Sequence, residues 1–169
     1  MGDDIAQTAR ERAKRCVEEV HRALGLTLDY EPETLPVLDH HLRQAREEPD
    51  PVLTLLAATA GAYFGELLRR RYDGRWVGHQ DPEGWTLTFD LAGLSVRPVA
   101  MARSAIQCTE SALTGPDLVL PPSRRALVQG VLTGLGCVDR EDYYRLSTRY
   151  EVLSAVFERL APPPPPDAN

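Results

Sequence analysis

Apolar residues recur at spacings of three and four along the first part of the chain, which is the period of an amphipathic helix. This pattern predicts a helix over residues 4–24 and a second helix from about residue 32 to residue 46. Two prolines, Pro49 and Pro51, interrupt the pattern, because proline removes a backbone donor and clashes with the preceding turn. The first fifty residues are therefore predicted to form two helices separated by short connections.

The next predicted helix, residues 51–72, is apolar around most of its circumference, which is typical of a helix at the centre of a domain. Gly61 and Gly65 lie one turn apart on this helix. Glycine costs roughly 1 kcal/mol relative to alanine inside a helix, so we expect close packing against a neighbouring element to compensate. Thr, Gly and Glu interrupt the apolar run 52–68, so its composition does not predict a membrane span.

Alternation of apolar and polar residues replaces the helical period after residue 74. It predicts a three-stranded antiparallel meander with one buried face. The predicted strands are residues 75–78, 85–90 and 94–97. Helical spacing returns in the last third of the chain, at residues 99–113, 124–135 and 140–160.

The last two predicted helices begin after good N-cap residues, Ser123 and Asp139. The apolar stripe of the first of them consists of Leu127, Val128, Val131 and Leu135, which we expect to face inward. The predicted fold is α+β, with the meander packed against about six helices. It forms a single domain over residues 1–160, followed by a disordered proline-rich tail at 161–169.

Charge and cysteine usage narrow the function classes. The 169 residues carry 19 basic and 25 acidic side chains, a net charge of −6, which opposes broad binding to nucleic acid or to an anionic membrane. Cys16, Cys108 and Cys137 show no paired or metal-type spacing, so we expect reduced thiols and a cytoplasmic protein. The charged N-terminus lacks the apolar segment of a signal peptide.

Residues that suggest catalysis or metal binding are few. Asp39, His40 and His41 are consecutive on a predicted helix, where neighbours point about 100° apart and cannot chelate as residues four apart can. A dyad of Cys108 with His79 would require the fold to bring the two together. We therefore predict no catalytic residue, no metal site and no cofactor.

The stretch from Gly61 to Trp76 holds the most distinctive polar residues. Glu66 interrupts an apolar helix, and we expect it to form a structural ion pair with an arginine, because buried charges usually have structural partners. The candidate protein-binding residues are Arg69, Arg70, Arg71 and Arg75. A basic cluster beside an aromatic residue can also bind nucleic acid, which the acidic balance of the chain disfavours. The residues with a structural role, or with a place in any pocket, are Glu66, Trp76, His79 and Trp85.

Three short motifs stand out: LDY at 28–30, GAYFGE at 61–66 and GRW at 74–76. Together they resemble those of small uncharacterised bacterial proteins with an LDY-type link, a GxYxGE helix and a GRW strand start. The resemblance covers about residues 26–115. It implies an α+β domain and no particular substrate.

The sequence contains no nucleophile motif, no phosphate-binding loop and no metal-type spacing. The leading interpretation is a non-enzymatic cytoplasmic protein that binds another protein, for example an acidic immunity or inhibitor protein that masks a basic partner. One alternative is a small-molecule-binding protein or small hydrolase with a pocket between sheet and helices. Another is a nucleic-acid accessory factor that uses the arginine cluster.

Overall fold

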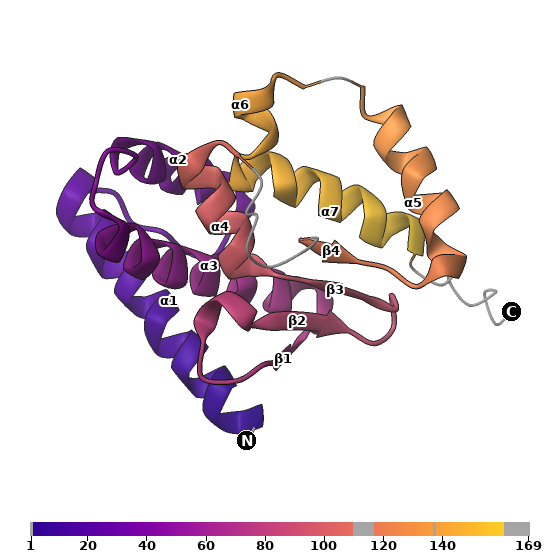
Figure 1. Cartoon of the computed structure of the whole chain (residues 1–169), viewed down its shortest axis with the longest axis horizontal. Helices are drawn as coiled ribbons and strands as arrows, with labels where there is room; N and C mark the ends of the chain where they lie inside the picture. Colours follow the sequence, from indigo (N-terminus) through magenta and orange to yellow (C-terminus); the bar gives the residue numbers. More distant parts are fainter. Residues whose placement is uncertain (1, 110–116, 137, 161–169) are drawn as a thin grey trace, which may run out of the picture.

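The computed structural model describes residues 2–109, 117–136 and 138–160, which form an α+β fold (Figure 1). The helices within this part are α1 (Gly2–Leu24), α2 (Leu35–Gln44), α3 (Asp50–Tyr72), α4 (Pro98–Gln107), α5 (Pro122–Gly134), α6 (Arg140–Tyr143) and α7 (Leu146–Leu160). Two short 3-10 turns are η1 (Pro32–Thr34) and η2 (Pro82–Gly84). The strands are β1 (Arg75–Val77), β2 (Thr86–Phe89), β3 (Leu94–Val96) and β4 (Leu118–Val119).

α3 is the central helix, as its all-round apolar composition predicted. Every residue from Leu56 to Leu68 is buried, and the helix packs against both α1 and α4. A Cβ atom on Gly61 would lie 2.7 Å from the backbone nitrogen of Val99 at the start of α4. A Cβ atom on Gly65 would collide with the ring of Trp76. The close packing expected of the two glycines is therefore confirmed.

Among the described helices, α3 alone is long and apolar enough to cross a membrane. The expectation that its composition is too polar for a span is therefore wrong. Burial gives it a different role, because 78% of its most apolar window lies inside the fold. A helix surrounded by protein on nearly every side is typical of the core of a soluble domain.

The four strands form one antiparallel sheet in the order β1-β2-β3-β4. Trp76 pairs with Leu87, and Leu87 pairs with Val96, so these three side chains share the buried face. α1 contacts β1, and α3 contacts β2. The predicted meander is confirmed. β4 was not predicted, because two residues are too few to show alternation, and only its pairing with β3 defines it.

The C-terminal region differs from its prediction in two ways. Ser123 lies inside the first turn of α5 and is not its N-cap, a position that Pro121 occupies. The predicted last helix is divided into α6 and α7, and the Asp139 side chain makes no capping hydrogen bond. The start of α7 is instead held by Asp39 of α2, which no local pattern could reveal. The proline-rich tail lies outside the described residues.

The predicted helix over 99–113 ends earlier, at Gln107. Cys108 follows in the left-handed conformation, with φ at 51°, and closes the helix as its C-cap. The predicted second helix begins as the turn η1 and ends at Gln44, not at residue 46. α5 and α7 lie on the side of the molecule away from α1 (Figure 1).

Candidate functional site

Glu66 is the centre of a structural network. Its side chain is 1% exposed, and both carboxylate oxygens accept hydrogen bonds from the Arg69 guanidinium at 3.0 Å. The Trp76 indole donates a third hydrogen bond of 2.8 Å to the same carboxylate. The hydrogen bonds that Arg69 donates to Glu66 raise the pKa of the Arg69 guanidinium. Glu66 therefore joins α3 to β1, as its expected ion pair implied, and its oxygens are occupied by protein donors.

The arginines after Glu66 are mostly engaged within the chain. The cluster consists of Arg69, Arg70, Arg71 and Arg75. The Arg70 guanidinium stacks over the Tyr30 ring, with Cζ 3.7 Å from the ring centroid. Arg75 forms an exposed ion pair of 3.6 Å with Asp90. Arg71 is exposed. Arg69, Arg70 and Arg75 each contact another side chain of the protein, so fewer of these guanidinium groups are available to a partner than the sequence suggested. The role of the cluster in protein binding stays a prediction.

Three of the predicted site residues, Trp76, Trp85 and His79, are brought together. Trp85 is 2% exposed, packs edge-to-face against Trp76, and donates a hydrogen bond of 2.9 Å to the backbone carbonyl of His79. The His79 side chain is exposed in the connection between β1 and β2. Cys108 is half-buried at the end of α4, and its thiol lies 3.9 Å from the Ala105 carbonyl. His79 and Cys108 share no hydrogen bond, so the structure gives no support to a catalytic dyad.

The described residues contain no group of three or more His, Cys, Asp or Glu side chains placed to hold a metal ion. The Asp39 carboxylate instead accepts hydrogen bonds from α7. His41, two residues after Asp39, is half-buried, and burial lowers its pKa, which favours the neutral imidazole. The three consecutive side chains therefore lie in different environments.

α5 is the helix whose burial departs most from its sequence pattern. Of the four residues expected to face inward, Val128 is buried and Val131 is half-buried, whereas Leu127 and Leu135 are exposed. At about 100° per residue, the apolar stripe from Leu127 to Leu132 covers an arc of about 140°. Val128 and Val131 lie inside that arc and are at least partly covered, whereas Leu135, which lies nearest its middle but follows the end of the helix, is 46% exposed. Both edges remain open to solvent.

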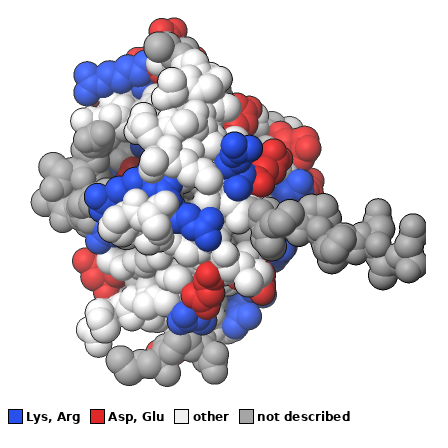
Figure 2. All heavy atoms as spheres, turned by 90° about the vertical axis from the view of Figure 1, so that its right-hand side faces the viewer, with Lys and Arg blue, Asp and Glu red and all other residues white. Residues whose placement is uncertain are grey.

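Exposed apolar residues continue on either side of α5 in the sequence. We define the α5 surface as Val119, Leu127, Leu132, Leu135 and Val138, each between 36% and 48% exposed. These are five of the eleven large hydrophobic residues that are exposed in the described part of the chain. Figure 2 looks at this side of the molecule, where uncharged side chains cover much of the face and basic side chains lie across its middle.

The charge along α5 is opposite in sign to the net charge of the whole chain. Residues 118–136 contain no Asp or Glu, and Arg124 and Arg125 lie at the start of α5. α5 itself is therefore apolar with basic side chains at its start, whereas Asp117 and Asp139 adjoin the α5 surface in sequence. Sequence periodicity identified Leu127 and Leu135 as part of an apolar face but could not show that they would stay exposed.

Comparison of the chain with protein-family models, with curated proteins and with solved structures finds no match. Function is therefore argued from the chemistry of the surfaces, because a fold class alone hosts many unrelated functions.

Proposed function

We propose that this domain works by binding another protein through the α5 surface and performs no chemistry of its own. The observation that supports the proposal is the partly covered apolar stripe of α5, in which Val128 is buried while Leu127 and Leu132 are each 36% exposed. Contiguous exposed apolar residues commonly mark interaction sites on soluble proteins. An amphipathic helix with an open apolar edge suits docking into a groove or against another helix.

Local charge favours a particular kind of partner. Arg124 and Arg125, with no acidic residue between 118 and 136, favour a partner whose apolar groove has carboxylates at its rim. The net charge of −6 by itself would fit a basic partner, as in the immunity or inhibitor interpretation. Charges at the contact outweigh distant ones, which salt screens over about 8–10 Å. We therefore favour an acidic-rimmed partner over a basic toxin for this surface.

The cellular location can be inferred from the cysteines and from the burial of α3. Cys16 and Cys108 are both free thiols, and α3, the one described helix of membrane-spanning composition, is mostly buried. Free thiols are the normal state in a reducing compartment. We infer a cytoplasmic location, and a cytoplasmic partner.

The test compares two variants of the full chain. In Leu127→Glu/Leu132→Glu, two carboxylates are placed on the open edges of the stripe. The control is Leu91→Glu, at a residue that is 83% exposed and belongs to a turn between β2 and β3. Affinity capture from the native cell identifies candidate partners, and the dissociation constant of each purified candidate is then measured with all three proteins. Thermal unfolding monitored by circular dichroism establishes that both variants are folded.

We expect a partner that binds the wild type and Leu91→Glu equally and binds the double variant at least tenfold more weakly, because burying an unpaired charge strongly disfavours a contact. A partner that binds all three proteins alike overturns the role of the α5 surface. Sedimentation that shows a wild-type dimer, lost in the double variant, would replace the foreign partner with a second copy of the chain. Absence of any variant-sensitive partner also contradicts the proposal.

A further inference from the structure

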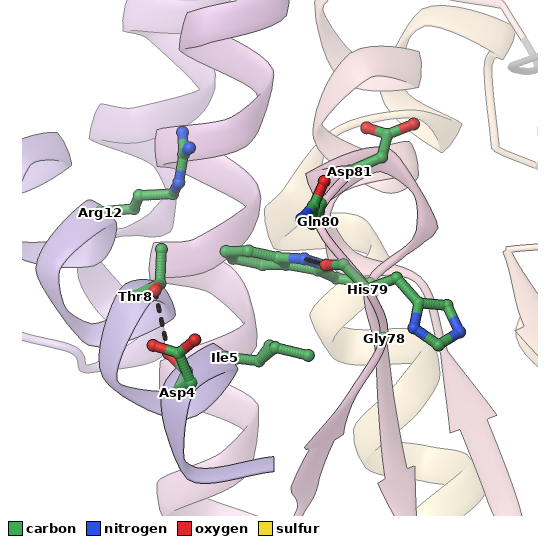
Figure 3. A pocket seen from close by; sticks show the side chains of 9 residues that line it. Asp4, Ile5, Thr8, Arg12, Gly78, His79, Gln80 and Asp81 are labelled. Atoms are coloured by element: carbon green, nitrogen blue, oxygen red, sulfur yellow. Dashed lines mark hydrogen bonds between the residues drawn. The ribbon is translucent and has the colours of Figure 1, made fainter. Parts of the chain in front are cut away.

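A cleft of about 650 Å³ lies between α1 and the connection that joins β1 to β2 (Figure 3). We call it the α1 cleft. It is lined by Asp4, Ile5, Thr8, Arg12, Gly78, His79, Gln80, Asp81 and Trp85. Its volume falls in the range of roughly 300–1,000 Å³ that is usual for small-molecule sites. It lies on the side of the molecule away from α5, so it is a separate surface from the one in the proposed function.

Arg12 is the distinctive residue of this cleft. Its Nε atom is buried and makes no hydrogen bond, and no described carboxylate forms an ion pair with its guanidinium. Its guanidinium lies over the Trp85 ring, whose centroid is 5.7 Å from Cζ. A buried polar group without a partner is costly, and guanidinium groups bind carboxylates through paired hydrogen bonds. Arg12 is therefore placed to receive an anionic group from a ligand.

The rest of the lining excludes some anions. Asp4 and Asp81 also line the cleft, so its side chains carry two negative charges and one positive charge. One Asp81 carboxylate oxygen accepts a hydrogen bond of 3.0 Å from the Glu83 amide, so the other oxygen is the one that a ligand could use. A dianion such as phosphate would meet repulsion from both carboxylates. A ligand with one carboxylate and one ammonium group would satisfy Arg12 and at least one aspartate together.

The positions of the lining residues also support a ligand with one carboxylate and one ammonium group. In Figure 3, Arg12, Thr8 and Asp4 lie along one wall on α1, whereas Gln80 and Asp81 come from the opposite wall. The Thr8 hydroxyl donates its hydrogen bond of 2.9 Å to the Asp4 carbonyl, which leaves its oxygen able to accept one from a ligand. Ile5 and Trp85 add apolar lining. The His79 ring points away from the α1 side chains, so the ligand does not depend on it.

We propose that the α1 cleft binds a small zwitterion of the amino-acid type, with an apolar side chain. Its carboxylate pairs with Arg12 on α1, its ammonium group lies toward Asp81 on the opposite wall, and its side chain lies beside Ile5 and Trp85. This assignment names a binding site and involves no bond making or breaking. It is independent of partner binding by the α5 surface.

The experiment measures binding of L-phenylalanine and of the dipeptide L-leucyl-L-phenylalanine to the full chain. Isothermal calorimetry gives the dissociation constant, and tryptophan fluorescence reports on Trp85 in the cleft wall. Two related compounds test the two charges: 3-phenylpropionate lacks the ammonium group, and phenethylamine lacks the carboxylate. Arg12→Gln removes the proposed carboxylate partner, and Arg22→Gln, at an exposed position further along α1, is the matched control.

We expect saturable binding of the amino acid or the dipeptide, and at least tenfold weaker binding of both related compounds. Arg12→Gln should weaken binding at least tenfold, whereas Arg22→Gln and the Leu127→Glu/Leu132→Glu variant should not change it. Thermal unfolding checks that Arg12→Gln is folded. The assignment is wrong if neither zwitterion binds at about 10 mM. It is also wrong if Arg12→Gln binds as the wild type does, or if 3-phenylpropionate or inorganic phosphate binds more tightly than the zwitterions.

Discussion

The Asp39 carboxylate of α2 accepts a hydrogen bond of 2.7 Å from the backbone amide of Leu146, although 107 residues separate the two in sequence. Its second oxygen accepts from the Ser147 amide at 3.1 Å and from the Ser147 hydroxyl at 2.6 Å. A carboxylate at the first turn of a helix satisfies free amides and complements the helix dipole. Burial nevertheless raises the pKa of Asp39, and these hydrogen bonds oppose that rise.

Asp39→Asn should destabilise the fold by about 2–3 kcal/mol. An asparagine side chain keeps one acceptor oxygen, but it places an NH₂ group, which is a donor, where the second carboxylate oxygen accepts hydrogen bonds from α7. The measurement is urea unfolding at neutral pH. Asp139→Asn is the control, since the sequence suggested that Asp139 caps this region but its side chain makes no capping bond. That control should stay within about 0.5 kcal/mol of the wild type. Equal small losses in both variants would contradict the role of Asp39.

Gly61→Ala should destabilise the protein by about 1–3 kcal/mol, even though alanine is the better helix former. The added methyl group would meet backbone atoms of Val99 and Pro98, which cannot move away without separating α3 from α4. Gly130→Ala in α5 is the matched control, because nothing lies within 4 Å of the added atom. It should stabilise the fold by about 0.5–1 kcal/mol, and urea unfolding compares the two. A stabilising Gly61→Ala would show that α3 and α4 are packed less closely than the structure indicates.

Features that depend on neighbours in sequence were the ones that could be predicted. Glu66 was expected to pair with a nearby arginine, and its partner is Arg69, three residues along the same helix, as helical geometry allows. The two glycines of α3 indicated a close approach but not which element approaches, and only the structure identifies Val99 and Trp76 as the neighbours. The alternation after residue 74 predicted three strands for the same local reason.

Features that depend on distant contacts were missed. Asp39 was grouped with two histidines as a candidate metal cluster, because its partners on α7 cannot be inferred from sequence spacing. The stripe of α5 was expected to face inward, since periodicity identifies an apolar face but not how much of it another element will cover. His79 and Trp85 were named as possible pocket residues and do line the α1 cleft, but its α1 wall was missed, because the cleft forms only when α1 packs beside the connection that carries Asp81.

Tyr63 should make the fold sensitive to alkaline pH. Its hydroxyl accepts a hydrogen bond of 2.9 Å from the Tyr30 amide. Burial raises the pKa of this hydroxyl to about 12, whereas the pKa of a tyrosine in the unfolded chain is about 10. Between these values the unfolded state has already released the proton that the folded state retains. The stability contributed by the buried neutral hydroxyl is therefore fully present below about pH 10 and is lost as the pH rises toward 12.

The measurement is the free energy of unfolding in urea, followed by circular dichroism at several pH values between about 8 and 11. The wild type should lose about 1 kcal/mol more than Tyr63→Phe between about pH 10 and 11, because the variant cannot release a proton at this position. Burial also raises the pKa of Tyr150 to about 12, but that residue is present in both proteins and cancels in the comparison. Parallel curves for the two proteins would show that folding does not hold the Tyr63 proton.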